Sequence, residues 1–297
     1  MYPSSFRYHK AKSFEEASEA LRALGPDARA IAGGQTLIPM MKLRLLRPRD
    51  LVDLGRIPDA CELCATDHGL EIGALARHQD IGGSEATVGY PILRDCALGI
   101  ADVQVRNMGT IGGSLAEVDP SGCWPTLLVA LDARVRCLGK DGVFEQSVRE
   151  LLADAYTPNL GAGELITRIL IDRRMLSGFG SYVAFKRAAP AYPTASCALM
   201  VHFDGDTIRS AKFGFGCLGL TPLAMDASSA TAGQPITPKL VQDTAEMAAA
   251  FVTPIPDNRG SENYKRSLLK ALVKRAFDNV ERRRKGEPVT ETHFYYG

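Results

Sequence analysis

The sequence has little that would tie it to nucleic acid, to a membrane or to an oxidising compartment. Its net charge is only +1, so it lacks the basic excess of a nucleic-acid-binding protein. No apolar run approaches the roughly 18 residues of a membrane span, and the N-terminus lacks the pattern of a signal peptide. The seven cysteines are odd in number and scattered, which favours reduced thiols over a disulfide framework. We therefore expect a cytoplasmic protein with no nucleic-acid partner and no transmembrane segment.

Motifs for metal-dependent or nucleophilic chemistry are also scarce. The five histidines are dispersed, and the HExxH, Walker lysine and G-x-S-x-G motifs are all missing. The lone C-x-x-C, Cys61–Cys64, has no second pair to complete a zinc site, so we interpret both cysteines as incidental. The lone G-x-G-x-x-G, Gly214–Gly219, has Pro222 too close behind it for the helix that a dinucleotide fold requires. We predict a strand end and turn there, no metal ligands, and no catalytic residues on this chain.

Length and patterning predict a globular protein of more than one domain. The 297 residues are 45% apolar and 23% charged, enough for two or three compact domains. Joints expected at 55–67 and 173–180 divide the chain into domains 1–57, 58–176 and 177–297. Periodicity, caps and turn residues predict helices at 13–24, 92–105, 124–131, 239–251 and 261–284, and strands at 28–32, 51–54, 70–74, 134–138, 165–171, 181–187, 194–203 and 207–215. A turn at Lys140–Gly142 is expected between the strands at 134–138 and 165–171.

Two glycine-rich turns separated by about 80 residues are the most informative feature. Paired glycines let the backbone approach a ligand closely, and successive N–H groups in such turns bind anions. Each turn also carries small hydroxyl residues, which can donate to phosphate oxygens. We predict that the two turns hold the two phosphates of one dinucleotide, and that Asp119, shortly after the second, holds a ribose hydroxyl. The candidate residues are Ala32, Gly33, Gly34, Gln35, Thr36 and Leu37 in the first turn and Thr110, Ile111, Gly112, Gly113, Ser114 and Leu115 in the second.

With their flanking residues, both turns resemble motifs of one family. Residues 32–42 and 104–115 closely resemble the two flavin motifs of the FAD-binding medium subunit of molybdenum hydroxylases. This family includes carbon monoxide dehydrogenase medium subunits and the flavin part of xanthine dehydrogenase. Supporting matches at Phe185–Arg187, Gly219–Pro222 and Ser261–Arg266 extend the resemblance over nearly the whole chain. It implies an α+β fold, in which a vanillyl-alcohol-oxidase-type FAD domain of two α/β subdomains precedes a C-terminal α+β domain.

The resemblance also implies a division of labour among three subunits. A large subunit would hold a molybdopterin-type cofactor and act on the substrate, and a small subunit would hold two [2Fe-2S] clusters. This chain would pass electrons from those clusters through FAD to an external acceptor, in a dimer of heterotrimers. Two alternatives stay open: a free-standing flavin-dependent oxidoreductase with its own substrate, and a scaffold subunit that has lost FAD. The sequence identifies neither the substrate nor the final acceptor.

By the same resemblance, three further residues lie near the cofactor. Lys186 matches a lysine close to the flavin ring, where a cation stabilises the reduced flavin. Tyr192 matches an aromatic residue that screens the ring from solvent, and Ile166 one that packs on the adenine or flavin side. Taken alone, Lys186 could instead be a surface residue of a strand, and Tyr192 an ordinary core residue.

Two positions leave open questions. Cys123 stands where many relatives carry an acidic residue that helps to hold FAD, so either Asp119 or Glu117 compensates or the contact is lost. The aromatic tail, His293–Gly297, either docks on a partner or packs on its own domain.

Overall fold

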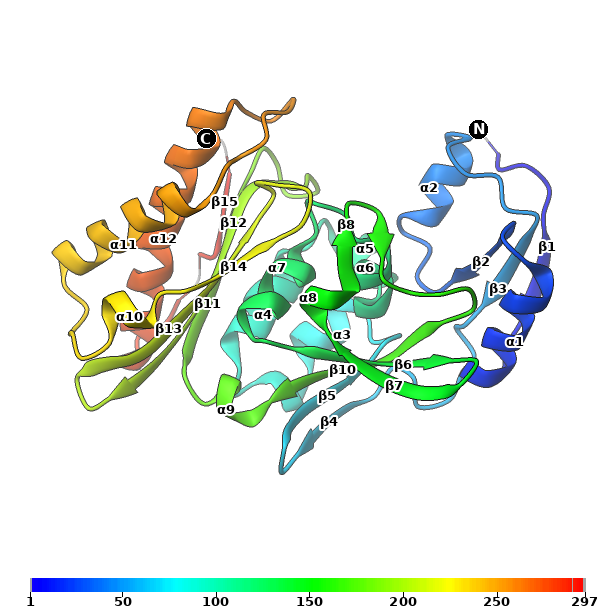
Figure 1. Cartoon of the computed structure of the whole chain (residues 1–297), viewed down its shortest axis with the longest axis horizontal. Coiled ribbons are helices and arrows are strands. Elements are labelled where there is room, and N and C mark those ends of the chain that lie inside the picture. Colours follow the sequence, from blue (N-terminus) through cyan, green and yellow to red (C-terminus); the bar gives the residue numbers. More distant parts are fainter. Residues whose placement is uncertain (1, 290, 296–297) are drawn as a thin grey trace.

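The computed structural model describes residues 2–289 and 291–295 of the chain. Three main β-sheets follow one another along the sequence and along the long axis of the molecule, with helices packed beside and between them (Figure 1). This mixture confirms the predicted α+β class. The domain boundaries after residues 57 and 176 stay predictions. Buried clusters extend across both of them: Leu165 packs with the N-terminal core, and Tyr182 with the central core.

The N-terminal part is a parallel β-α-β-α-β unit with strand order β1-β3-β2. The side chain of Ser13 accepts a hydrogen bond from the Glu16 N–H and so begins the first helix where predicted. Parallel strands end at the same edge of a sheet, so the first glycine turn, which follows β2, lies at that edge. The elements are β1 (Arg7–Lys10), α1 (Phe14–Leu24), β2 (Ala28–Ile31), α2 (Leu37–Lys42) and β3 (Asp50–Asp53).

The central part is an antiparallel sheet of order β4-β5-β10-β6-β7 with short helices packed on it. The helix expected at 92–105 is two helices, because Asp102 caps a new one after the chain turns beyond Gly99. The elements are β4 (Leu63–Thr66), β5 (Gly69–Gly73), α3 (His78–Gly83), η1 (Glu85–Thr87), α4 (Pro91–Gly99), α5 (Val103–Arg106), α6 (Ile111–Glu117), α7 (Cys123–Ala130), β6 (Arg134–Gly139), β7 (Gly142–Ser147), α8 (Val148–Leu151), β8 (Leu152–Asp154), β9 (Thr157–Pro158) and β10 (Leu165–Asp172).

Both edge strands of this sheet were missed by the sequence prediction. The turn at Lys140–Gly142 joins β6 to β7, not β6 to β10. Likewise, β4 lies inside the joint expected at 55–67. Edge strands are exposed on much of their surface, so neither segment shows the apolar alternation that reveals a half-buried strand.

The C-terminal part is a sheet of order β14-β13-β12-β11-β15 with helices on both faces. In Figure 1, α11 and α12 cover one face, while α4 and α7 of the central part cover the other. The joint expected at 173–180 contains α9 and the start of β11. The elements are α9 (Arg173–Leu176), β11 (Phe179–Lys186), β12 (Pro193–Asp204), β13 (Thr207–Gly216), β14 (Leu223–Asp226), α10 (Ser228–Thr231), α11 (Pro238–Phe251), α12 (Glu262–Arg284) and β15 (His293–Tyr295).

The G-x-G-x-x-G motif is the end of β13 and a turn, as predicted. Its glycines serve packing: a Cβ on Gly216 would lie 2.6 Å from Ser196 Oγ, and one on Gly214 3.1 Å from the Ala130 Cβ of α7. Helix α7 therefore lies directly against the backbone of β13. As far as Tyr295, the tail packs on its own domain, because β15 pairs in parallel with β11. This confirms the second of the two alternatives for the tail; residues 296–297 lie outside the described residues.

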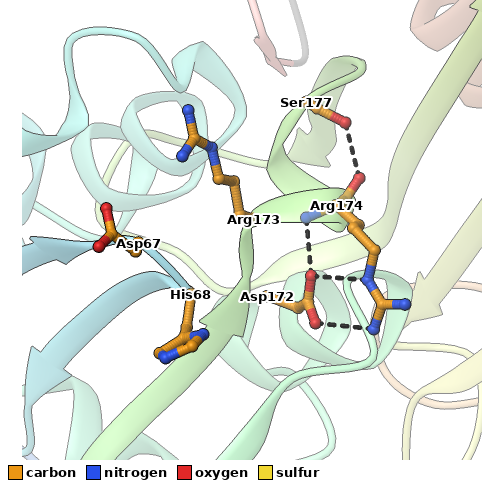
Figure 2. A pocket seen from close by; sticks show the side chains of 6 residues that line it. All are labelled: Asp67, His68, Asp172, Arg173, Arg174 and Ser177. Carbon is orange, nitrogen blue, oxygen red and sulfur yellow. Dashed lines mark hydrogen bonds and ion pairs between the residues drawn. The ribbon is translucent and has the colours of Figure 1, made fainter.

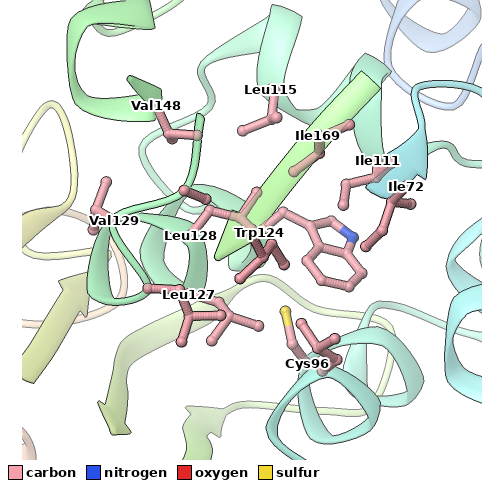
Figure 3. Packing of buried hydrophobic residues seen from close by; sticks show 14 of the residues in the cluster. Ile72, Cys96, Ile111, Leu115, Trp124, Leu127, Leu128, Val129, Val148 and Ile169 are labelled. Carbon is pink, nitrogen blue, oxygen red and sulfur yellow. The ribbon is translucent and has the colours of Figure 1, made fainter. Parts of the chain in front are cut away.

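The central core forms around Trp124, whose side chain is fully buried (Figure 3). Side chains from the sheet and from several helices pack in the same cluster, including Ile72, Cys96, Ile111 and Ile169. The core continues into the C-terminal sheet, so the two parts share one packed interior.

All seven cysteines are free thiols, five of them buried, with Cys61 exposed and Cys64 half-buried. Within residues 2–289 and 291–295, none of the helices is both long enough and apolar enough to cross a bilayer.

Candidate functional site

The two glycine turns meet in the structure. A Cβ on Gly33 would lie 2.7 Å from the Met108 carbonyl carbon and 2.8 Å from Gly109 Cα. The first turn therefore presses its backbone against the residues that lead into the second, and glycine is required for this contact. The two turns therefore lie together, one from the N-terminal part and one at the start of α6 in the central part, and their common site stays a prediction.

The first turn presents unused hydrogen-bond donors. In the described chain, the backbone N–H groups of residues 33–36 donate to no protein acceptor. Gly34 has a φ of +69°, a conformation that glycine adopts without strain and that turns successive N–H groups toward one side. The Thr36 hydroxyl does not cap α2, so it is also available. These donors line a cradle between β2 and α2 whose chemistry suits an anion.

In the second turn, most backbone N–H groups already have protein acceptors. The N–H groups of Ile111 and Gly112 donate to the Ala76 and Ala74 carbonyls at 3.0 and 2.9 Å, and that of Gly113 donates to Thr110 Oγ1 at 3.2 Å. Gly112 is buried against Ala74, whereas Gly113 is exposed. The N–H groups of residues 111–114 therefore have protein acceptors, and within the described chain only that of Thr110 in the second turn has none. The first turn instead leaves four successive N–H groups free.

Asp119 and Tyr192 lie together, although the sequence separates them widely. The Asp119 carboxylate is beside the Tyr192 hydroxyl; burial and this negative charge both raise the pKa of Tyr192. The Tyr192 side chain is 47% exposed, so the alternative of an ordinary core residue is wrong. The guanidinium of Arg259, which sequence analysis did not select, lies over the Tyr192 ring.

Lys186 is completely buried, so the alternative of a surface residue is also wrong. Its ammonium group donates to the Gly99 carbonyl at the end of α4, and burial lowers its pKa. The thiol of Cys123 is buried, and the charges of Lys186 and Asp119 both act on it. Burial raises the pKa of Cys123, so this thiol is neutral.

Three of the apolar candidates belong to the core. The side chains of Ile111, Leu115 and Ile166 are at most 6% exposed and pack in the central cluster. They hold the second turn and β10 in place, so any contact with a ligand would be at the edge of that core. Whether Ile166 touches the cofactor stays a prediction.

His78 is a further residue of this region that sequence analysis missed. The His78 ring accepts a hydrogen bond from Trp124 Nε1 at 3.0 Å. The backbone N–H of His78 donates to the Gly109 carbonyl at 3.0 Å. It thereby fixes the approach to the second turn. No local pattern indicates this role, because a lone histidine at the start of a short helix has no distinctive spacing.

Three open cavities lie elsewhere, and none is lined by a predicted site residue. The cavity of about 550 Å³ at β10 and α9 is lined by six residues, of which three bond to one another (Figure 2). Asp172 caps α9 and pairs with Arg174 at 2.9 Å, while Ser177 donates to the Arg174 carbonyl. These three residues therefore serve as a helix cap. Within the described residues, no group of three or more His, Cys, Asp or Glu is placed to hold a metal ion.

Comparisons with known proteins cover nearly the whole chain. The family described as "FAD binding domain in molybdopterin dehydrogenase" matches residues 4–172, and "CO dehydrogenase flavoprotein C-terminal domain" matches residues 180–280. The glyceraldehyde dehydrogenase medium chain of Sulfolobus acidocaldarius is 34% identical over 283 residues, covering 94% of this chain and 100% of that protein. The carbon monoxide dehydrogenase medium chain of Afipia carboxidovorans is 34% identical over 287 residues, covering 96% and 100%. Among solved structures, carbon monoxide dehydrogenase from Hydrogenophaga pseudoflava superposes with a TM-score of 0.91 and 33% identity, over 95% of this chain and 99% of that one.

Proposed function

Because this chain belongs to the family of FAD-binding medium subunits of molybdenum hydroxylases, we propose that it is the electron-transfer subunit of a heterotrimer. The resemblance predicted from the glycine motifs is thereby confirmed, and the chain is the FAD-binding subunit of an oxidoreductase. In the proposal, a large subunit carries a molybdopterin-type cofactor and a small subunit carries two [2Fe-2S] clusters. Electrons pass from those clusters through FAD on this chain to an external acceptor.

The observation that carries the assignment to FAD is the cradle of the first turn. Four successive N–H groups without protein acceptors suit the oxygens of a pyrophosphate, and the second turn lies against the same backbone. We assign the pyrophosphate to residues 33–36 and the adjoining ribityl and ribose groups to Gly113, Ser114 and Asp119. FAD supplies the interconversion of two-electron and one-electron transfer.

Two side chains then adjust the flavin's surroundings. Lys186 contributes a positive charge from a buried position, and a buried charge acts more strongly than an exposed one. Tyr192, which is half exposed, covers the ring against solvent. With Cys123 neutral, Asp119 is the acidic residue that compensates at this end of the site.

The first test is the absorbance spectrum of the purified full chain, alone and copurified with its partners, with chromatography of the cofactor released by acid. We expect FAD on this chain, and iron–sulfur absorbance and molybdenum only in the copurified sample. Flavin in neither sample would contradict the proposal and favour a scaffold subunit. Turnover of an organic substrate by the isolated chain would favour a free-standing oxidoreductase. The mass of the copurified complex in solution tests the proposed dimer of heterotrimers.

Substitution of the turn glycines tests the placement of the cofactor. Gly34→Val forces a branched residue into φ +69°, and Gly113→Val adds bulk on the exposed face of the second turn. We expect both variants to lose FAD on gel filtration. Gly89→Val is the matched control, because a Cβ at this exposed glycine meets nothing within 4 Å. Full FAD retention by both turn variants would rule out the assignment of the pyrophosphate.

A further inference from the structure

A cluster from three separate segments surrounds Tyr192 and joins the central part to the C-terminal part. Arg259 lies in the loop before α12, Tyr192 in the loop before β12, and Asp119 and Ser121 directly follow α6. The Arg259 guanidinium carbon lies 5.7 Å from the centre of the Tyr192 ring, within the range of a cation–π contact. On its other side, the same guanidinium donates to Ser121 Oγ at 2.8 Å. One side chain thus contacts both the aromatic ring and the segment that carries Asp119.

The segment on the Asp119 side is held rigidly. The Ser121 N–H donates to Asp119 Oδ1 at 2.8 Å, which fixes the direction of that carboxylate. The Cys217 N–H donates to the Pro120 carbonyl at 3.2 Å, and the Tyr156 N–H donates to the Val118 carbonyl at 2.9 Å. The Arg259–Ser121 bond therefore reaches a fixed point of the central part.

The loop that carries Arg259 is also fixed. Asp257 accepts from the Arg259 N–H at 2.9 Å and pairs with the Lys265 ammonium at 3.0 Å. The Lys265 side chain is only 3% exposed and donates further to the Ile255 carbonyl at 2.8 Å and the Cys217 carbonyl at 3.2 Å. Arg259 itself is 28% exposed, and its charge is only partly shared with Asp257, whose carboxylate is 3.7 Å away. The guanidinium is consequently held in one place over Tyr192.

We propose that Arg259 is a positioning residue of the flavin site, which sets the plane of the Tyr192 ring and the place of the Asp119 segment for bound FAD. The inference rests on the proposed function, because it takes Tyr192 to be the aromatic residue beside the flavin. An aromatic ring has two faces, and Arg259 occupies one of them. The other face of this half-exposed ring is then the one open to the isoalloxazine. Arg259 acts through Tyr192 and Ser121 and has no role in the electron transfer itself.

The test is the emission of FAD bound to the full chain, with the affinity for FAD measured alongside. A flavin held against an electron-rich ring loses emission, so a misplaced Tyr192 restores it. We expect R259M to raise the emission of bound flavin severalfold and to weaken FAD binding about tenfold, since it removes one cation–π contact and one charged hydrogen bond. R284M is the matched control: Arg284 makes a similar contact over Phe203, 4.5 Å from the ring centre, at the opposite end of β12 from Tyr192.

A double-mutant cycle separates positioning from general loss of structure. In the Y192L background, R259M should change the emission no further, because the ring through which Arg259 acts is gone. R259K, which keeps a cation near the ring, should recover part of the quenching and provides a second test if R259M folds poorly.

The proposal would be overturned if both Arg259 variants left the emission unchanged while Y192L raised it. If the emission were also unchanged in Y192L, Tyr192 would not lie beside the flavin, and the proposal would be overturned. Absence of FAD from the wild-type chain would instead contradict the proposed function.

Discussion

At the scale of single residues, burial decides which groups near the second glycine turn carry charge. His78 is 5% exposed and accepts from Trp124, so its neutral form is built into the core. Burial and the nearby charge of Arg106 lower the pKa of His78 to about 4. His293, beside Lys186 and Arg106, is half-buried, and desolvation with these two charges lowers its pKa to about 3. Both rings therefore link protonation to the stability of the site.

The His78 shift predicts a loss of stability in acid. In the unfolded chain its pKa is about 6.5, so between pH 6.5 and 4 the unfolded state binds a proton that the folded state does not. Stability contributed by the neutral ring is complete above pH 6.5 and falls as the pH drops, by about 3 kcal/mol at pH 4. Urea unfolding at pH 7.5, 5.5 and 4.5 measures the slope. His78→Gln, whose amide can still accept from Trp124, should remove much of it; the same slope in this variant would contradict the prediction.

The isolated cysteine pair gives a second prediction at this scale. Cys61 is exposed and Cys64 half-buried, and both are free thiols outside the turns. Replacing both by serine should leave the flavin content intact, as measured by the ratio of flavin to protein absorbance. Loss of FAD from this double variant would show that the pair takes part in the site.

At the scale of elements, one buried ion pair fixes α4 against α12. Arg283 and Asp95 form two bonds of 2.7 Å between side chains that are 10% and 8% exposed, and Asp95 also accepts from the Tyr182 N–H at 3.2 Å. Because α4 ends at Gly99, whose carbonyl holds Lys186, this pair also fixes the buried cation of the site. A buried pair is costly to break, since the remaining partner keeps an uncompensated charge.

We therefore expect Asp95→Asn to destabilise the fold by about 3 kcal/mol. The exposed pair Lys239–Asp243 on α11 provides the control, and Asp243→Asn should cost no more than about 0.5 kcal/mol. Chemical denaturation of the two variants under the same conditions makes the comparison. Equal effects of the two substitutions would show that the buried pair contributes little.

At the scale of the whole molecule, all three parts contribute residues to the proposed flavin site. The N-terminal part brings the first turn, the central part brings the second turn with Asp119, and the C-terminal part brings Lys186, Tyr192 and Arg259. The tail strand β15 lies along β11 beside Lys186, and the His293 ring packs against Gly99. Its position covers the edge of the C-terminal sheet next to the buried cation.

Removing this strand should uncover an edge that can pair with other chains. A chain that ends at residue 291 is expected to unfold at a lower temperature than the full chain and to self-associate. Thermal unfolding and light scattering after gel filtration measure both effects. Tyr295→Ala, at a half-exposed position, is the control and should remain close to the full chain. A truncated chain that is monomeric and equally stable would exclude a role for β15 as an edge cover.

The sequence by itself determined most elements and the family. The helix at 13–24 has a serine cap, a glycine stop and an apolar stripe, and the strands at 194–203 and 207–215 flank an Asp-Gly-Asp turn, so each signal is local. The glycine motifs were recognisable for the same reason, since a turn that approaches a ligand constrains consecutive residues.

Only the tertiary structure decided which groups meet. Arg259 contacts Ser121 across 138 positions of sequence, and Lys186 contacts Gly99 across 87. Neither pairing leaves a mark in the residues around it, because the contact depends on how whole sheets and helices pack. The same holds for the two turns: their composition is alike, but packing gives acceptors to the N–H groups of residues 111–114 in the second turn and to none of residues 33–36 in the first. Local chemistry thus indicated candidate parts of a site, and long-range packing decided which of those groups lie together.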